Sequence, residues 1–161
     1  MLHINVPGWK TLRLAHLFLD YNGTLALDGR ILPGVAERLE ELSRHLDIHV
    51  LTADTFGSVR EELKVVPCDL PIIPPQGQST QEQAQAKADH LRAFDPALSA
   101  AMGNGRNDAL MLREAALGIA LLQEEGAAPQ TLAAADVVCP SILSALDLLR
   151  HPLRLAATLR G

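Results

Sequence analysis

Short apolar runs alternate with longer amphipathic stretches along the sequence, and this pattern predicts alternating strands and helices. The apolar runs predict strands at residues 16–19, 48–51, 70–73, 98–102, 117–121 and 136–138. Helical spacing or a polar cap predicts helices at residues 35–46, 55–63, 79–94, 108–116, 127–135 and 141–149, and a last helix after Pro152.

Strands and helices repeated in this order predict a parallel sheet that is covered by helices on both faces. We therefore expect an α/β fold, a Rossmann-like three-layer sandwich. Two short hairpins are expected beside it, within residues 2–14 and within residues 25–31, where Asp28 and Gly29 form a tight turn. With 161 residues and no internal repeat or linker, we expect one domain that spans residues 1–161.

Composition excludes several functional classes without naming one. The net charge is -5 and Lys and Arg do not cluster, which disfavours nucleic-acid binding because phosphate backbones need cationic partners. No window approaches the roughly 20 apolar residues of a membrane span, and polar residues, Pro and Gly interrupt the first residues, where a secretory signal would be apolar. Cys68 and Cys139 lack CxxC spacing, so we expect buried, free thiols in a reducing cytoplasm.

Polar and glycine-rich segments follow three of the predicted strands: DYNGTL (20–25), TAD (52–54) and GNGRND (103–108). The carboxyl ends of parallel strands meet at one edge of a sheet, where ligands bind beside the point at which strand order reverses. Asp20 would place a carboxylate at that edge. The backbone N–H groups of Asn22, Gly23 and Thr24 would face an anion such as phosphate. For this segment alone, a strand-ending Asp with an ordinary Asn-Gly turn is the alternative.

Two further segments offer groups that suit an anion. The Thr52 hydroxyl and the backbone N–H of Ala53 would make two donors for an oxyanion, although a helix cap is the alternative role of Thr52. Lys87, in the polar predicted helix, would supply a compact positive charge for phosphate. The alternative for Lys87 is a solvated surface lysine.

The GNGRND segment follows a strand and precedes a helix, as a dinucleotide-binding turn does. Asp108 stands at the position of the third glycine of that fingerprint, where a carboxylate would repel a pyrophosphate. Asn104 and Asp108 would instead present oxygen ligands toward Asp20, of the kind that Mg²⁺ prefers. An Asn-Gly turn with Asp108 as a helix cap is the alternative for this segment.

In this order, DYNGTL, Thr52, Lys87 and GNGRND resemble the motifs of the haloacid dehalogenase (HAD) superfamily of aspartyl-phosphate phosphotransferases. More narrowly, DYNGT, TAD, GNGRNDALML, LGIAL and AADVV are similar to segments of the capless soluble proteins related to the phosphorylation domain of P-type ATPases. The resemblance extends over most of the chain. It implies a HAD-like fold and a Mg²⁺-dependent phosphatase or phosphotransferase activity.

The resemblance also implies a role for each matching residue. Asp20 would attack a phosphoryl group and carry it as an aspartyl phosphate, and Lys87 would orient Asp20. The phosphoryl oxygens would be bound by Gly23, Thr24, Thr52, Ala53 and Lys87. Mg²⁺ would be held by Asp20, the backbone carbonyl of Asn22, and Asn104 or Asp108. A covalent intermediate within fixed positive charge is sound chemistry for phosphoryl transfer.

Two residues depart from the usual superfamily pattern. Asn22 stands where an Asp usually acts as general acid and base, and an amide cannot exchange a proton at neutral pH. General acid–base catalysis contributes about 10² to 10⁴ in rate, so we expect hydrolysis to be slowed by a factor of that order. Asn104 stands where a metal-ligating Asp is usual, and we expect this change to weaken Mg²⁺ binding and to make Asp108 matter more.

The motif spacing is short, with 32 residues from Asp20 to Thr52 and 35 from Thr52 to Lys87. These intervals leave no room for the cap domain that many relatives insert. An open site would accept a phosphorylated small molecule or a phosphoprotein, or would be covered by a second subunit of a homo-oligomer. Two other functions stay open: a signalling or binding module in which Asp20 keeps its phosphoryl group, and a catalytically weak scaffold.

Overall fold

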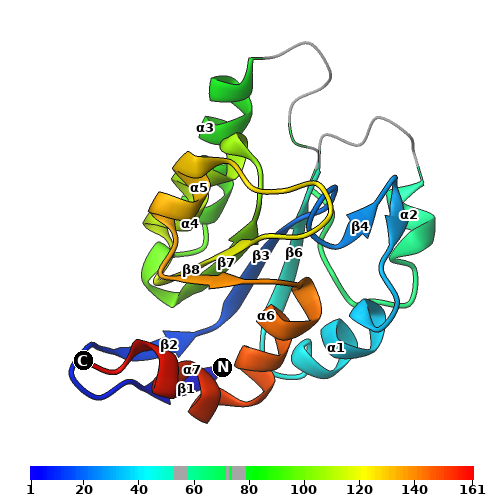
Figure 1. The fold of residues 1–161 in the computed structure, drawn as a ribbon. Coiled ribbons are helices and arrows are strands. Elements are labelled where there is room, and N and C mark those ends of the chain that lie inside the picture. The colour runs from blue at the N-terminus through cyan, green and yellow to red at the C-terminus, as the bar shows by residue number, and fades with distance from the viewer. Residues whose placement is uncertain (53–57, 72, 74–78) are drawn as a thin grey trace.

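The protein is described here by a computed structural model that covers residues 1–161 except residues 53–57, 72 and 74–78 (Figure 1). Its strands are β1 (Leu2–Asn5), β2 (Thr11–Leu14), β3 (His16–Asp20), β4 (Ala26–Leu27), β5 (Arg30–Ile31), β6 (Asp47–Leu51), β7 (Ser99–Gly103), β8 (Leu117–Leu121) and β9 (Val137–Cys139). Its helices are α1 (Val35–Leu42), α2 (Val59–Glu62), α3 (Thr80–Arg92), α4 (Ala109–Glu114), α5 (Pro129–Ala134), α6 (Ile142–Arg150) and α7 (Pro152–Leu159), with 3₁₀ turns η1 (Pro96–Leu98) and η2 (Arg106–Asp108).

Five parallel strands form the central sheet in the order β6-β3-β7-β8-β9. Of these five strands, β3 comes first in the chain, and it has β6 on one side and β7 on the other, so strand order reverses between β3 and β7. A crevice opens at the carboxyl ends of two strands that are related in this way. Asp20 ends β3 and Gly103 ends β7, so two of the motif loops begin at this crevice.

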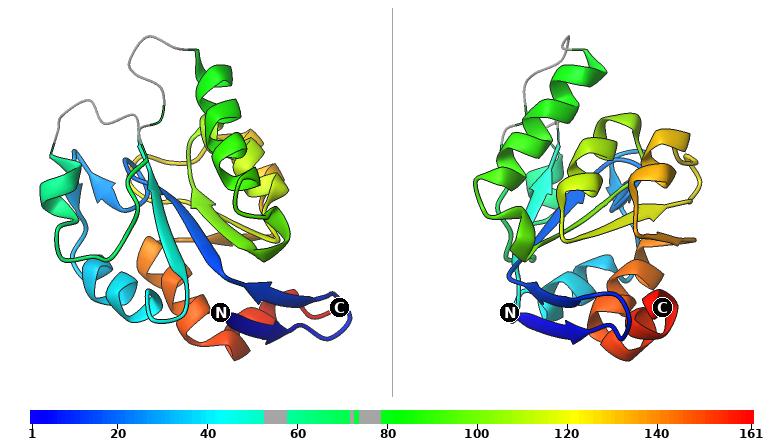
Figure 2. Two further views of the ribbon diagram at one scale, coloured as in Figure 1. Left: turned by 180° about the vertical axis from the view of Figure 1, so that it is seen from behind. Right: turned by 90° about the vertical axis from the view of Figure 1, so that its left-hand side faces the viewer.

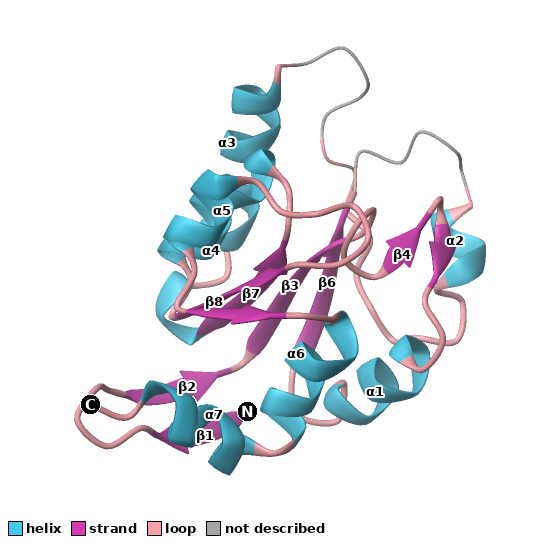
Figure 3. Cartoon of the chain, in the orientation of Figure 1, coloured by secondary structure: helices cyan, strands magenta, loops and turns pink. Residues whose placement is uncertain are grey.

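Helices cover both faces of the sheet, with α1 and α6 on one face and α3, α4 and α5 on the other (Figures 1 and 3). Successive side chains of a strand point to opposite faces. In β3, Leu17 and Leu19 join the core beneath α1 and α6, and Phe18 joins the core beneath α3 and α4. The predicted Rossmann-like three-layer sandwich is confirmed.

Two antiparallel hairpins flank the sheet. The β1–β2 hairpin packs beside α7, which brings the two ends of the chain to the same side of the molecule (Figure 2). The β4–β5 hairpin follows the Asp20 loop, and the backbone N–H of Ile31 ties it to α2 by donating to Glu62 Oε2 at 3.0 Å. Within the described residues, the connections from β3 to β6 and from β6 to β7 hold only this hairpin, α1, α2, α3 and η1, with no inserted domain.

Some predicted elements differ from the structure. The apolar run at residues 70–73 forms no strand where it is described, because Pro71 has no N–H to donate to a ladder; Asp69 makes a single parallel bridge with His49 instead. The expected helix at residues 55–63 is limited to α2, and its expected cap, Thr55, lies outside the described residues. Cys139 is buried as expected, whereas Cys68 is only half-buried. None of the helices in the described ranges has the length and hydrophobicity that a membrane span requires.

Candidate active site

The motif loops meet around Asp20 at the carboxyl end of the sheet. They enclose a cavity of about 210 Å³, called the phosphoryl cavity below, which is lined by Asp20, Asn22, Thr52, Ile73, Gln83, Lys87, Asn104, Gly105, Asn107 and Glu125. This volume is several times the roughly 30 Å³ that a water molecule occupies in the liquid. The cavity therefore has room for a phosphoryl group together with solvent.

Asp20 is held through both of its carboxylate oxygens. Lys87 Nζ donates to Asp20 Oδ1 at 2.6 Å, and Thr24 Oγ1 donates to Asp20 Oδ2 at 3.2 Å. Burial and then the neighbouring Asp108 carboxylate raise the pKa of Asp20 from 3.8 to about 6, against the opposing effect of Lys87. Near neutral pH the carboxylate is thus ionised in surroundings that disfavour its charge, and a bound cation would relieve this cost.

Lys87 is a fixed cation between two carboxylates. Its side chain is 3% exposed, and Nζ donates to Asp20 Oδ1 at 2.6 Å and to Asp108 Oδ1 at 2.7 Å. Burial by itself lowers the pKa of Lys87, but Asp108 and Asp20 together outweigh burial and raise this pKa above its usual range. The alternative of a solvated surface lysine is therefore excluded.

Asp108 fixes the GNGRND loop from inside the protein. Its carboxylate is fully buried, and Oδ2 accepts hydrogen bonds from the backbone N–H groups of Asn104 at 3.0 Å and Gly105 at 2.9 Å. A Cβ atom on Gly103 would lie 2.5 Å from this carboxylate, which explains why β7 ends in glycine. Asp108 therefore positions Lys87 and the loop, and Asn104, which lines the phosphoryl cavity where Asp108 does not, is better placed to reach a metal.

Asn104 presents its amide oxygen to the Asp20 side of the cavity. Its Nδ2 donates to the Gly126 carbonyl at 2.9 Å, and its Oδ1 lies 3.5 Å from Thr24 Oγ1, which also donates to Asp20. Asn22 also lines the cavity, and its carbonyl would join Asp20 and Asn104 in a set of hard oxygen donors of the kind that suits Mg²⁺ with several retained waters. No group of three or more His, Cys, Asp or Glu side chains in the described part of the chain could hold a metal. Such a site would thus depend on amide and carbonyl oxygens beside Asp20.

The other predicted site residues lie as follows. Thr52 directly follows β6, is 8% exposed and lines the cavity. Gly23 adopts a φ of +78°, and a Cβ atom there would lie 2.6 Å from both Asn104 Nδ2 and Glu125 Oε2, so glycine allows these side chains to close over the Asp20 loop. Asn22 is exposed and lines the cavity. Ala53 lies outside the described residues.

Five lining residues were not predicted from the sequence as site residues: Ile73, Gln83, Gly105, Asn107 and Glu125. Gln83 Oε1 accepts a hydrogen bond from Asn107 Nδ2 at 3.0 Å, which links α3 to the GNGRND loop. A signal for Gln83 was present, because it lies one helical turn before Lys87 on the same face. A signal for Glu125 was also present, because it follows β8, whose carboxyl end reaches the same edge of the sheet. Ile73 gave no such signal.

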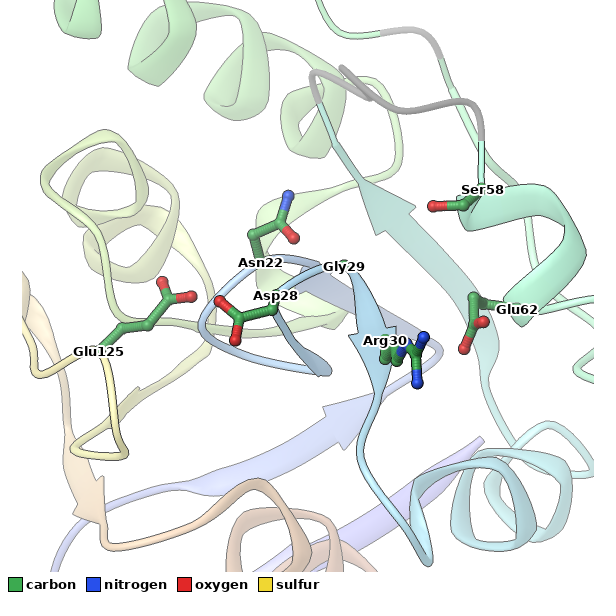
Figure 4. Close-up of a pocket in the computed structure, with 7 residues that line it drawn as sticks. All are labelled: Asn22, Asp28, Gly29, Arg30, Ser58, Glu62 and Glu125. Carbon is green, nitrogen blue, oxygen red and sulfur yellow. The ribbon is translucent and has the colours of Figure 1, made fainter.

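A second hollow of about 590 Å³, called the outer pocket below, adjoins the phosphoryl cavity. It is lined by Asn22, Asp28, Gly29, Arg30, Ser58, Glu62 and Glu125. Figure 4 shows Asp28 and Glu125 on one side of the β4–β5 hairpin, and Arg30 and Glu62 on the other. Three carboxylates and one guanidinium therefore surround the outer pocket.

No protein-family model matches the sequence. Two uncharacterised proteins of Methanocaldococcus jannaschii are similar to part of it. MJ0073 is 48% identical over 60 residues, which are 37% of this chain, and the chain covers only 64% of MJ0073. MJ0072 is 51% identical over 39 residues, which are 24% of this chain and 89% of MJ0072.

Solved structures with the same fold are HAD-superfamily phosphatases. The 3-deoxy-D-manno-octulosonate 8-phosphate phosphatase of Moraxella catarrhalis, in complex with magnesium, phosphate and KDO, has a TM-score of 0.64 at 16% identity, over 84% of this chain and 85% of that one. The cobalt-bound phosphatase of Haemophilus influenzae has a TM-score of 0.65 at 11% identity, and the match covers 85% of this chain and 87% of that one. BT1666 of Bacteroides thetaiotaomicron has a TM-score of 0.64 at 15% identity, and the match covers 86% of this chain and 95% of that one. The chain therefore has the fold of the HAD-superfamily phosphatases, and it belongs to one family with MJ0072.

Proposed function

We propose that this protein is a Mg²⁺-dependent phosphatase or phosphotransferase that works through an aspartyl phosphate on Asp20. The observation that carries the proposal is the hydrogen-bonded group of Asp20, Lys87 and Asp108 at the wall of the phosphoryl cavity. A buried carboxylate oriented by a buried cation, beside oxygen donors for a metal, is what such a reaction needs. The similar folds of phosphatases, one of them solved with magnesium and phosphate, support the proposal.

Each residue has a part in the proposed reaction. An oxygen of Asp20 attacks the phosphorus atom as the bond to the leaving-group oxygen breaks, and water later attacks the same phosphorus and restores the carboxylate. Lys87 keeps Asp20 in place and opposes the negative charge of the phosphoryl oxygens, and Thr52 donates to one of them. Mg²⁺, held by Asp20, the Asn22 carbonyl and Asn104, supplies further positive charge when it is bound.

Asn22 gives the second half of the reaction a distinct character. Its side chain lines the cavity where a carboxylic acid would serve proton transfer, but it cannot exchange a proton at neutral pH. With no other group to transfer the proton, the aspartyl phosphate would last about 10² to 10⁴ times longer than it would with Asp at this position. A long-lived phosphoenzyme is also what a place among the soluble relatives of P-type ATPases implies.

The outer pocket is the proposed place for the leaving group of a phosphorylated small molecule. Because three carboxylates and one guanidinium line it, a neutral or cationic leaving group suits it better than a polyanionic one. A phosphoprotein remains a second substrate class, and a homo-oligomer that covers the site is part of the proposal. A cytoplasmic location would suit the two free cysteines.

The test compares p-nitrophenyl phosphate hydrolysis by the wild-type protein and by Asp20→Asn, with Mg²⁺ present. Asp20→Asn should abolish the activity. The matched control is Asp47→Asn, because Asp47 is 75% exposed at the opposite end of the sheet, and this variant should keep full activity. Full activity of Asp20→Asn would refute the proposal.

A phospho-accepting signalling module is the second candidate, and Asn22 is the residue that favours it. Acetyl phosphate should then leave a stable phosphoryl adduct on Asp20, detected by mass spectrometry, without turnover of phosphate esters. If the protein is a phosphatase, the adduct should form and decay, and Asn22→Asp should make it decay faster.

A further inference from the structure

We propose that Glu125 carries out the proton transfers that Asn22 cannot, as the general acid and general base of the reaction. This inference rests on the proposed phosphatase function of Asp20 and adds a residue to it. It concerns the step in which the leaving-group oxygen takes up a proton and the step in which water gives one up.

Glu125 lies where the two hollows of the site meet. Of the described residues that line them, Asn22 and Glu125 belong to both the phosphoryl cavity and the outer pocket. A substrate with its phosphoryl group in one and its leaving group in the other has its scissile P–O bond at this junction. Glu125 therefore lines the junction at which the leaving-group oxygen would take up its proton, as Asn22 does.

The loop that carries Glu125 is fixed to both motif loops, so its position is defined. Gln123 Nε2 donates to the Gly23 carbonyl at 3.1 Å, and Asn104 Nδ2 donates to the Gly126 carbonyl at 2.9 Å. These bonds lie on either side of Glu125 in the chain. A Cβ atom built on Gly23 would lie 2.6 Å from Glu125 Oε2, which places the carboxylate against the Asp20 loop.

The Glu125 carboxylate is also accessible and has no partner among the described residues. Among the described residues it has neither a hydrogen bond nor an ion pair, and its residue is exposed to solvent. Asp20 is the other described carboxylate that lines the phosphoryl cavity, and it serves as the nucleophile. Asp108 is fully buried and accepts from Lys87 and the backbone. Glu125 is therefore the carboxyl group of the cavity that is available for proton transfer.

The two steps balance as follows. Asp20 carboxylate, the phosphate monoester dianion and Glu125 carboxylic acid give the aspartyl phosphate, the free alcohol and Glu125 carboxylate. In the second step the aspartyl phosphate, water and Glu125 carboxylate give Asp20 carboxylate, hydrogen phosphate and Glu125 carboxylic acid. The proton passes from Glu125 to the leaving-group oxygen and returns to Glu125 from water.

The experiment measures how fast the phosphoenzyme forms in one turnover, with Mg²⁺, from two esters. p-Nitrophenolate leaves without a proton, whereas an alkyl alkoxide such as that of glycerol phosphate needs one. Glu125→Gln should form phosphoenzyme from p-nitrophenyl phosphate at close to the wild-type rate, and from glycerol phosphate about 10² to 10⁴ times more slowly. Its phosphoenzyme should also persist longer, and adding Asn22→Asp should restore the reaction with glycerol phosphate. Glu124→Gln, which changes the neighbouring exposed carboxylate, should behave as wild type with both esters.

The possible outcomes separate this inference from the function on which it rests. Equal slowing of both esters by Glu125→Gln, or a raised Mg²⁺ requirement with unchanged dependence on the leaving group, would overturn the assignment of Glu125 as a proton donor. A wild-type protein that forms no phosphoenzyme from p-nitrophenyl phosphate or acetyl phosphate would refute the proposed function itself.

Discussion

Asp20→Asn should stabilise the metal-free folded protein while it removes activity. Burial and the Asp108 carboxylate raise the pKa of Asp20 from 3.8 to about 6. One pKa unit corresponds to about 1.4 kcal/mol, so ionised Asp20 lowers the free energy of unfolding by up to about 3 kcal/mol above pH 7. Asparagine has nearly the same shape and no charge, and it leaves Lys87 paired with Asp108. The variant should therefore gain up to about 3 kcal/mol at pH 7.5.

The pH dependence of this gain follows from proton binding. Between pH 4 and 6 the folded protein keeps the Asp20 proton and the unfolded chain has lost it, so the folded state binds more protons. Wild-type stability from this group is thus present below pH 4 and falls as the pH rises to 6. The difference between Asp20→Asn and wild type should be small near pH 4, widen across this window and stay constant above pH 7.

The assay is urea unfolding followed by far-UV circular dichroism at several pH values, in EDTA. Asp47→Asn is the control, because Asp47 is 75% exposed and its loss should change stability little. An Asp20→Asn protein that is less stable than wild type at pH 7.5, or one whose difference from wild type does not vary with pH, would refute the reasoning. Adding Mg²⁺ should stabilise wild type and have little effect on Asp20→Asn, because a ligand stabilises only the state that binds it.

Three other substitutions test the same structure. Lys87→Met leaves Asp20 and Asp108 buried without their shared cation, so the free energy of unfolding should fall by about 3–5 kcal/mol in urea and activity should be lost. Gly103→Ala places a Cβ atom 2.5 Å from the Asp108 carboxylate, so both stability and kcat should fall, the former by about 1–3 kcal/mol. Burial lowers the pKa of His49 to about 4, against Asp69, while its ring stacks on Phe18. Between pH 4 and 6.5 the unfolded chain therefore binds one more proton than the folded protein, so acidification should lower the free energy of unfolding of wild type by up to about 3 kcal/mol through this group. His49→Phe should remove that loss, which urea unfolding across this pH range would measure.

Strand and helix order could be predicted because the strands of the central sheet are mostly buried on both faces and are therefore mostly apolar. Residues 70–73 satisfy that pattern, yet they form no strand where they are described, because one missing donor at Pro71 outweighs it. The hydrophobic pattern indicates which residues are buried, whereas hydrogen bonding between neighbouring strands also requires a backbone N–H group at each position.

The order of the motifs along the chain predicted which residues come together in the site, but not the contacts that each of them makes there. Asp20 and Lys87 are 67 positions apart, and their contact at 2.6 Å follows from the crevice between β3 and β7. The burial of Asp108 beneath Lys87 could not be predicted, since its residue type fits a metal ligand, a helix cap and a partner for lysine equally well. Glu125 was missed although it follows β8, because its charge alone does not distinguish it from the other polar residues of that loop.

Asp20 and His49 together give the protein opposite pH dependences in nearly the same window. Stability from Asp20 falls between pH 4 and 6, and stability from His49 rises between pH 4 and 6.5, each by up to about 3 kcal/mol. Their partners differ, Lys87 and Thr24 for the first and His16 and Asp69 for the second, so the two contributions should add. These two slopes should nearly cancel in wild type. Asp20→Asn should therefore remove a fall of stability with rising pH, and His49→Phe should remove a rise. At each pH the double variant should differ from wild type by the sum of the two single-variant differences, and a clear departure from that sum would contradict the assignment.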